Sequence, residues 1–370
     1  MEGSVRKIAV TAASLAVTAM LAANGVASAS SPHANTSGNA ATFRACMVTD
    51  IGGINDRSYN QLTWLGMQAA QAAKPRLITS VYLPSTSSAD YARNIAAFVA
   101  DKCGIIVTVG FLMANATEAA AKAHPGRRFA IVDCTYRSGC LTGRKLKNLD
   151  QLAFNTVQDA FLGGYLAAGM SKTDVVATYG GKHFSTITIY MDGFWDGVQY
   201  YDRQHHAHVK VLGWNEQTQK GIFAKSFVDV GAGKRIANSL INDGADVIFP
   251  IAGGTGLGSL SAIRSADASG RRVAAEWPDT DGCFSIAAFC KVFLTSVTKG
   301  IPTAVEDVVL AGDNGSFGRI YIGTLANGGV ALAPYHDFAN RIPAQLKARL
   351  ARVAAAIKSG KIIPATKSPV

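Results

Sequence analysis

Residues 43–73 read FRACMVTDIGGINDRSYNQLTWLGMQAAQAA, and this stretch decides the fold class. The apolar run at its start ends at Asp50 and predicts a β-strand. Two glycines follow, and residues 56–73 then predict a helix, because Tyr59, Leu62 and Leu65 recur on one stripe. A strand, a Gly/Asp turn and a helix in this order open a β-α-β unit.

The same alternation continues along the N-terminal part of the chain. Strands are predicted at residues 77–84, 104–110 and 128–134, and helices at 88–102 and 114–125. The segment GIIVTVG at 104–110 is apolar almost throughout, as expected for a strand that helices cover on both faces. This order predicts a doubly wound parallel sheet.

The pattern restarts after residue 155. Helices are predicted at residues 157–171, 193–204, 232–244 and 256–269, and strands at 185–191, 208–214, 245–252 and 271–277. A late helix at 284–299 and strand-like segments at 305–310 and 318–324 follow. The sequence thus predicts an α/β protein with two similar lobes, each built on a doubly wound parallel sheet.

The composition is that of a large folded protein. Of the 370 residues, 48% are hydrophobic and 16% are charged, which is ample for buried cores and excludes a disordered chain. The net charge is +11, but the chain contains no long basic run and no basic patch interleaved with aromatic residues. We therefore expect a positive surface that faces an anionic envelope, and no nucleic-acid partner.

The first 29 residues predict an export signal peptide. Arg6 and Lys7 precede the apolar run IAVTAASLAVTAMLAA, and Ala27-Ser28-Ala29 forms a small-residue cleavage site. An uncleaved membrane anchor is the alternative, although the run is short for a spanning helix. Residues 30–42 predict a disordered tether. We expect an exported protein, extracellular or in the cell envelope, without the cysteine-centred cleavage box of a lipoprotein.

The cysteines suggest disulfides, because their number is even and the protein is expected to be exported. They are Cys46, Cys103, Cys134, Cys140, Cys283 and Cys290. The pairs 134/140 and 283/290 are close enough in sequence for short loops, which would leave 46 with 103. Buried free thiols are the alternative, and spacing alone does not decide the connectivity.

Aspartates and glycines collect where the expected strands end. They lie at Asp50, Gly110, Asp133, Gly253 and Asp279. In open α/β sheets, ligands bind beyond the carboxyl ends of the strands. Two such units facing each other would therefore place these turns on either side of a ligand cleft.

No sequence motif indicates an enzyme. GGTGLGS lacks the Gly-Lys-Ser/Thr ending of a phosphate loop and does not fit G-x-G-x-x-G. G-x-S-x-G and H-E-x-x-H are absent, so we expect no nucleophile, no cofactor and no metal. A cleft with carboxylates, aromatic side chains and backbone amides suits a neutral polyhydroxylated ligand, whose diol donates to a carboxylate and whose base stacks on a ring.

Several segments, in the same order, resemble the basic membrane protein family, the purine-nucleoside-binding proteins of ABC importers. They are VTDIGGINDRSYNQ, QDAFLGGYLAA, IYMDGFWDGVQYY, KSFVDVGAGK, GADVIFPIAGGTGLG and FLTSVTKG. The resemblance implies a type I periplasmic-binding-protein-like fold, in which hinge crossovers join two lobes. The N-terminal lobe would comprise residues 43–154 with about 278–318, and the C-terminal lobe residues 155–277 with about 319–370.

The resemblance also implies the binding residues of the N-terminal lobe. Asp50 would bond the edge of the base, Tyr59 would stack on it, and Asn60 would lie beside it. Asp133 would face the ligand from the same lobe. The alternatives are that Asp50 and Asp133 only cap the helices that follow, and that Tyr59 is a core residue.

The remaining implied residues complete the pocket from the other side. Phe227 would stack on the opposite face of the base, Gly253 would offer backbone to the ribose, Asp279 would bind the ribose hydroxyls, and Lys299 would complete that end. The alternatives are a core role for Phe227, a tight turn at Gly253, and a helix-end cation at Lys299. The turn PDTDGC leaves Asp281 as a second candidate for the ribose.

We expect a monomeric, exported solute-binding protein that captures a purine nucleoside and delivers it to ABC permease subunits in the membrane, without catalysis. Two departures from the family pattern are Tyr59 in place of phenylalanine and the missing lipoprotein box. The missing box motivates one alternative, a ligand-sensing receptor of the same fold that signals to a membrane partner. A nucleoside-processing enzyme is the third hypothesis, motivated by the Asp-rich cleft.

Overall fold

The computed structural model describes residues 42–368 and residue 370. They belong to one compact unit, Ala40–Val370. The expected signal peptide and nearly all of the expected tether lie outside the described residues. In the described part of the chain, no helix combines the length and the hydrophobicity needed to cross a bilayer.

The first sheet has six strands in the order β13-β5-β4-β3-β1-β2. Its strands are β1 (Phe43–Val48), β2 (Ile78–Leu83), β3 (Ile105–Val109), β4 (Phe129–Val132), β5 (Leu149–Phe154) and β13 (Ile320–Gly323). Every neighbouring pair in it is parallel. The strands β3 and β4 are buried along their whole length, as their apolar runs predict. The strand β5 is also fully buried but was not predicted, because LDQLAF contains Asp150 and Gln151.

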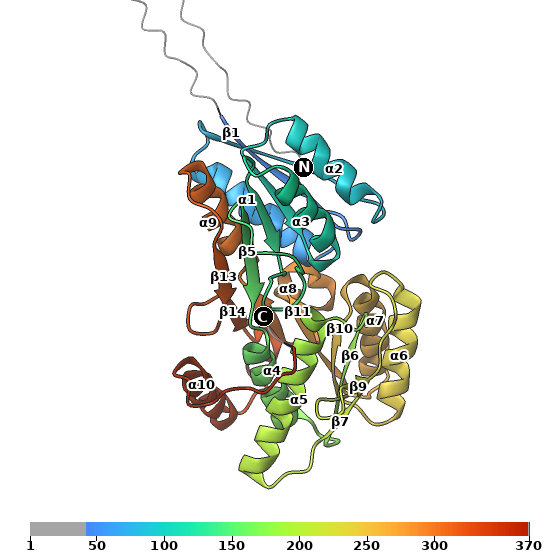
Figure 1. Cartoon of the computed structure of the whole chain (residues 1–370). Coiled ribbons are helices and arrows are strands. Elements are labelled where there is room, and N and C mark those ends of the chain that lie inside the picture. The colour runs from blue at the N-terminus through green and yellow to red at the C-terminus, as the bar shows by residue number, and fades with distance from the viewer. Residues whose placement is uncertain (1–41, 369) are drawn as a thin grey trace, which may run out of the picture. The chain divides into compact units, whose positions relative to one another are not determined.

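Helices cover both faces of the first sheet and complete the first lobe (Figure 1). They are α1 (Tyr59–Ala73), α2 (Asp90–Ala100), η1 (Phe111–Met113), α3 (Ala114–Ala123) and α9 (Ile301–Asp313). The helices α1 and α9 pack closely at Gly66, where a Cβ would lie 2.5 Å from the Pro302 carbonyl oxygen. The cores of the two faces are separate clusters around Met47 and Ile106.

The second sheet also has six strands, in the order β14-β12-β11-β10-β6-β7. They are β6 (Val175–Gly180), β7 (Lys210–Leu212), β10 (Val247–Ile251), β11 (Ala274–Asp279), β12 (Phe293–Lys299) and β14 (Val330–Leu332). All pairs are parallel except β12 with β14, which is antiparallel. The expected class, α/β with parallel sheets, is confirmed.

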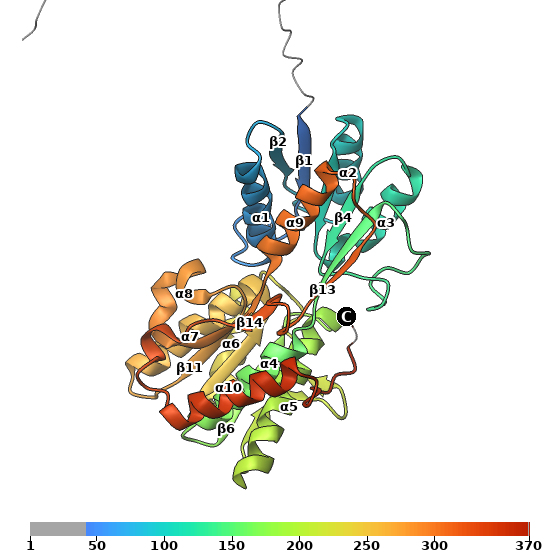
Figure 2. The same cartoon turned by 90° about the vertical axis from the view of Figure 1, so that its left-hand side faces the viewer.

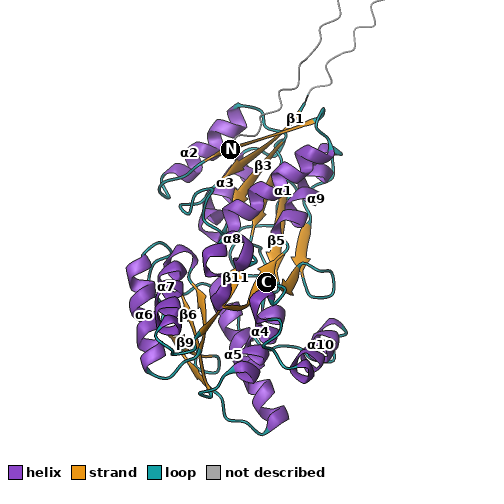
Figure 3. Cartoon of the chain, turned by 180° about the vertical axis from the view of Figure 1, so that it is seen from behind, coloured by secondary structure: helices purple, strands orange, loops and turns teal. Residues whose placement is uncertain are grey.

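The second lobe adds helices to both faces of this sheet (Figure 3). They are α4 (Val157–Met170), α5 (Ser185–His205), α6 (Val230–Asn242), η2 (Gly253–Thr255), α7 (Gly256–Ala268), α8 (Gly282–Ser285), η3 (Ala287–Val292), η4 (His336–Phe338) and α10 (Ala344–Lys358). A small hairpin, β8 (Trp214–Asn215) with β9 (Lys220–Gly221), follows β7. The helices α4 and α5 approach closely because Gly197 leaves room for the backbone of Phe161, whose carbonyl oxygen would lie 2.0 Å from a Cβ.

The chain passes between the two sheets after β5, after β12 and after β13. The strands β11 and β12 belong to the second sheet, and β13 belongs to the first. The return to the first lobe therefore consists of α9 and β13, within residues 301–323, and does not begin near 278. The sequence does not show this, because residues 284–299 have the pattern of a helix.

Three of the expected elements are wrong. Residues 185–191 begin α5, because the side chains from Ile187 to Met191 are all buried, and this packing outweighs their β propensity. Residues 293–299 form the buried strand β12 between β11 and β14. Residues 305–310 lie in α9, where Val305, Val308 and Val309 are buried at helical spacing.

All six cysteines are paired in disulfides. The bonds join Cys46 to Cys103, Cys134 to Cys140 and Cys283 to Cys290. The first bond links β1 to the turn before β3, and the other two close short loops beside strand ends. The expected pairing is therefore present in the structure.

Candidate functional site

A cleft lies at the carboxyl ends of the strands, with walls from both lobes. It contains about 620 Å³ of empty space, a volume that includes open solvent at its mouth. The residues that line it share positions just after strands or at helix starts: Asp50, Ile51, Gly52, Asp56, Ser58, Tyr59, Phe111, Leu112, Ile187, Phe227, Val228, Ile251, Ala252, Gly253, Gly254, Pro278 and Asp279.

Asp50 is held in place by the turn that follows β1. Its carboxylate accepts hydrogen bonds from the Gly52 N–H at 2.8 Å and from the Asn60 side-chain amide at 2.7 Å. The Asn60 side chain also accepts from the Asp50 N–H at 3.1 Å. Burial raises the pKa of Asp50, and the two hydrogen bonds oppose that shift. Asn60 itself is fully buried, so it positions Asp50 and does not line the cleft.

Asp56 organises the start of α1, which carries Tyr59. Its carboxylate accepts from the backbone N–H groups of Ser58, Asn60 and Gln61 at 2.9, 2.9 and 3.1 Å. These are N–H groups that the first turn of a helix leaves without a partner. The residue sequence NDRSYNQ therefore turns the ring of Tyr59 and the hydroxyl of Ser58 toward the cleft.

Aromatic side chains from both lobes meet at the cleft. Phe227, from the loop before α6, lies with its ring centroid 6.3 Å from that of Phe111, which follows β3. Phe111 also contacts Phe184 across the lobes, with ring centroids 4.6 Å apart. These rings supply flat apolar surfaces of the kind on which a base or a sugar face stacks.

The turn after β10 requires glycine. Gly253 has a φ of +53°, in the left-handed region that a side chain rarely adopts. A Cβ at the neighbouring Gly254 would lie 3.1 Å from the Phe227 carbonyl oxygen, which is a tight contact. The backbone of this turn thus forms part of the cleft wall beside Phe227.

Asp279, at the end of β11, connects the two lobes. One oxygen accepts from the Tyr190 hydroxyl at 2.7 Å, and the other accepts from the Ser58 hydroxyl at 2.6 Å. Ser58 belongs to the first lobe and Tyr190 to α5 of the second. Asp279 has a φ of +69°, so its carboxylate is presented from a left-handed backbone at the strand end.

A buried ion pair lies behind these residues. The Lys299 ammonium is 2.8 Å from an Asp133 oxygen and 3.4 Å from an Asp279 oxygen. It lies 4.7 Å from the centre of the Tyr59 ring, a cation–π contact. Burial alone would lower the pKa of Lys299, but the two carboxylates outweigh burial and raise it.

The Tyr59 hydroxyl, which a phenylalanine at this position would lack, lies beside the same cluster. This hydroxyl hydrogen-bonds to Asp133, and burial together with the Asp279 and Asp133 carboxylates raises the pKa of Tyr59 well above its ordinary value. Burial raises the pKa of Asp133 as well, against the opposing effect of Lys299. The phenol therefore stays neutral and donates to the buried carboxylate.

The structure brings together most of the residues that the sequence implied. Five of them line the cleft: Asp50, Tyr59, Phe227, Gly253 and Asp279. The other three, Asn60, Asp133 and Lys299, contact lining residues from behind. Lys299 ends β12, so its alternative role as a helix-end cation does not apply.

The sequence reasoning missed four residues around the cleft: Ser58, Phe111, Phe184 and Tyr190. Phe111 directly follows Gly110, which ends the third expected strand. Its place just after a strand end could have identified it as a cleft residue. Tyr190 was hidden because residues 185–191 resemble a strand. Ser58 and Phe184 carry no signal of their own, since each is placed beside the cleft by a contact with a residue far away in the chain.

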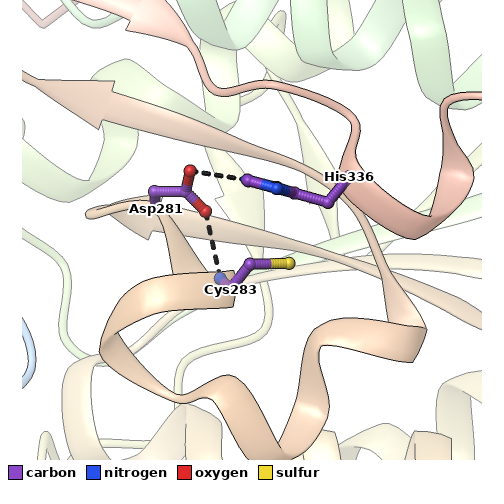
Figure 4. Close-up of side chains that lie close together, drawn as sticks. All are labelled: Asp281, Cys283 and His336. Carbon is purple, nitrogen blue, oxygen red and sulfur yellow. Dashed lines mark hydrogen bonds and ion pairs between the residues drawn. The ribbon is translucent and has the colours of Figure 1, made fainter.

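A separate cluster beside the cleft contains Asp281, Cys283 and His336 (Figure 4). The Asp281 carboxylate lies 2.7 Å from the His336 ring nitrogen and also accepts from the Cys283 N–H at 3.0 Å, which caps α8. The Cys283 sulfur is bonded to Cys290 and has no thiolate to offer a metal. Asp281 therefore has a structural role, and it does not line the cleft.

Two lobes with a cleft between the ends of their strands define the class of periplasmic solute-binding proteins. A solved ABC transporter solute-binding protein from Aeropyrum pernix K1 superposes with a TM-score of 0.75 at 21% identity, over 87% of this chain and 92% of that one. A solute-binding protein from Conexibacter woesei DSM 14684 gives a TM-score of 0.65 at 16% identity, over 87% and 98% of the two chains.

The family model described as Bmp, ABC transporter substrate-binding protein PnrA-like, matches residues 43–334. The chain belongs to this family, as the resemblance implied, and is an ABC transporter substrate-binding protein, not an enzyme. The ABC transporter nucleoside-binding protein BmpA of Lactococcus lactis is 29% identical over 98% of this chain and 99% of its own length. A CD4+ T-cell-stimulating antigen of Listeria monocytogenes is 29% identical over 74% and 75% of the two chains.

Proposed function

We propose that this protein captures a purine nucleoside between its lobes and delivers it to an ABC importer. The observation that carries the proposal is the cleft itself. It combines rings from both lobes, Tyr59 and Phe227, with two carboxylates, Asp50 and Asp279, at its lining. The similarity to a nucleoside-binding protein of Lactococcus lactis over nearly the whole chain supports the same ligand class.

Each part of a nucleoside has a matching group. A planar base fits between aromatic rings, and a purine offers more stacking area than a pyrimidine or a sugar. Asp50, fixed by Asn60, accepts a hydrogen bond from the edge of the base. Asp279 accepts from the ribose hydroxyls, because a carboxylate has acceptor sites beyond those that Ser58 and Tyr190 use.

Lys299 and Asp133 act as positioning residues. The ammonium neutralises part of the buried negative charge and keeps Asp279 oriented toward the cleft. The Tyr59 ring is fixed by its hydroxyl at Asp133 and by Lys299 at its face. We infer that this cluster sets the geometry of the pocket without touching the ligand.

Isothermal titration calorimetry of the purified protein tests the proposal with adenosine, guanosine, inosine, cytidine and a sugar panel. We expect sub-micromolar to micromolar affinity for at least one purine nucleoside, about −8 kcal/mol or better, with the nucleoside recovered unchanged by chromatography. Binding to sugars alone, or release of free base, would refute the proposal.

The cellular setting is part of the same proposal. The family assignment supports ABC permease subunits as partners and export from the cytoplasm. We propose a monomer, because the ligand cleft is complete within one chain. Analytical ultracentrifugation with and without nucleoside tests this: a dimer at micromolar concentration would contradict it.

A further inference from the structure

Exposed basic residues gather at the amino ends of the strands of the first sheet. Because all strands of this sheet are parallel, their amino ends share one edge, opposite the carboxyl ends that line the cleft (Figure 2). We call the following six exposed residues the basic edge: Arg76 before β2, Lys102 before β3, Arg144, Lys145 and Lys147 before β5, and Arg319 before β13.

The positive charge of the basic edge is largely unmatched. Of its members, only Arg319 has a carboxylate within ion-pair distance among the described residues, at 3.9 Å from Asp150. The acidic residues nearby are already used: Asp101 pairs with Arg44, and Asp313 pairs with Lys74.

The basic loop at residues 142–147 is held firmly and borders a groove. The buried Asn148 side chain donates to the carbonyl oxygens of Ala121, His124 and Arg127 at 2.9, 3.1 and 2.9 Å, which fixes the loop against the end of α3. Glu118, also in the groove, accepts from the Thr142 and Gly143 N–H groups, so it supports the loop. The basic side chains therefore project from a loop that is hydrogen-bonded to α3 and to the turn that follows it.

The amino ends of the second sheet carry basic residues as well, but exposed acidic residues lie among them. Lys172, Arg271, Arg272 and Lys291 precede β6, β11 and β12, while Asp174 and Asp243 precede β6 and β10. The contrast between the two sheets is therefore one of degree.

The extent of the basic edge identifies the kind of partner. The strands β2 and β13 are the two outermost strands of the sheet, so the basic residues span its whole width, roughly 24 Å at the usual strand spacing. A single small anion cannot contact residues this far apart, whereas an extended anionic surface can. Two exposed apolar side chains, Leu77 (41% exposed) and Phe317 (38% exposed), stand beside β2 and β13 at the same edge.

We propose that the basic edge is a docking surface for a bilayer of anionic phospholipids. Basic side chains attract the headgroups, and the two apolar side chains reach the interface between headgroups and acyl chains. The chain also enters the sheet at this edge, since β1 begins there at Phe43. Docking in this orientation leaves the cleft, at the other ends of the strands, open to its ligand.

Co-sedimentation of the full chain with vesicles tests the proposal. Vesicles of phosphatidylcholine alone are compared with vesicles that also contain phosphatidylglycerol, at low and high salt. We expect binding that requires phosphatidylglycerol and is lost at high salt. The triple variant R144S/K145S/K147S should bind about a hundredfold more weakly, at roughly fivefold for each basic residue removed from the surface. The single variant K145S should lose roughly fivefold.

The matched control is the triple variant K210S/K220S/K234S, which removes the same charge from exposed positions of the second lobe. It should bind vesicles as well as the unaltered protein, and thermal unfolding should show all variants folded. Both triple variants keep residues 1–41, so any membrane affinity of that segment is common to them. Equal binding by the two triple variants would overturn the proposal. The proposal would also fail if the protein bound vesicles of phosphatidylcholine alone as tightly as vesicles that contain phosphatidylglycerol. It would fail as well if the protein bound a short DNA duplex through the basic edge more tightly than it binds vesicles.

Discussion

Glu276 should make the protein less stable as the pH rises. It lies in the middle of β11, fully buried, three residues before Asp279, and neither of its carboxyl oxygens has a hydrogen-bond partner among the described residues. Gly163 of α4 lies directly against it, since a Cβ there would be 2.5 Å from a carboxyl oxygen. Burial raises the pKa of Glu276 from 4.5 to about 8.

The size of the effect follows from that shift. The carboxyl group is neutral in the folded protein up to about pH 8 but ionises above pH 4.5 in the unfolded chain. The stabilisation that the neutral carboxyl gives is therefore complete below pH 4.5. Between pH 4.5 and about pH 8, the free energy of unfolding falls by about 1.4 kcal/mol per pH unit. The total loss is about 5 kcal/mol.

The substitution Glu276→Gln removes the titration while keeping the shape. Urea unfolding followed by circular dichroism, at a series of pH values from 4 to about 9, gives the free energy of unfolding of both proteins. The other titrating groups are common to both and cancel in the difference. We expect the variant to gain about 1.4 kcal/mol per pH unit relative to the unaltered protein between these limits.

A control variant, Asp307→Asn, makes the same carboxyl-to-amide change at an exposed position of α9. Its stability curve should run parallel to that of the unaltered protein. If the Glu276→Gln curve is parallel too, the carboxyl of Glu276 is ionised in the folded protein at neutral pH. The argument from burial without a partner is then wrong.

Four further outcomes are expected. Phe227→Ala should weaken nucleoside binding in calorimetry by about 1–3 kcal/mol, whereas Tyr59→Phe should cost less because the ring is kept; equal losses would contradict stacking. Asp279→Ala should weaken the binding of nucleosides but hardly affect the binding of a free base, and Asp281→Ala should leave both affinities nearly unchanged. The reverse result would assign the ribose contact to Asp281. Lys299→Met should lower the free energy of unfolding by about 3–5 kcal/mol, because buried carboxylates lose their counter-charge; a change below about 1 kcal/mol would show that they are solvated or protonated. Peptide mapping without reductant should recover all three disulfides, and free thiols at these positions would contradict the structure.

Local patterns in the sequence determined the fold class and some of the residues that line the cleft. The run from Phe43 to Asp50 and its Gly/Asp turn identify a strand and a turn from neighbouring residues alone. The helix α1 was also predicted, but the expected stripe is not its buried face, since Leu65 is 48% exposed and Thr63 and Met67 are buried instead. The turns after β1, β10 and β11 could be recognised as cleft-facing, because parallel strands present their carboxyl ends at one edge. Asp50, Gly253 and Asp279 were therefore within reach of the sequence.

Tertiary structure decided the elements and residues whose environment is built by distant parts of the chain. Residues 185–191 have high β propensity but form a helix, since burial against α4 and the second sheet stabilises them more than local preference does. Ser58 reaches Asp279, and Lys299 reaches Asp133, over separations of 221 and 166 residues. Local pattern carries no information about such pairs, because the energy of a buried contact depends on which groups the folded chain brings together.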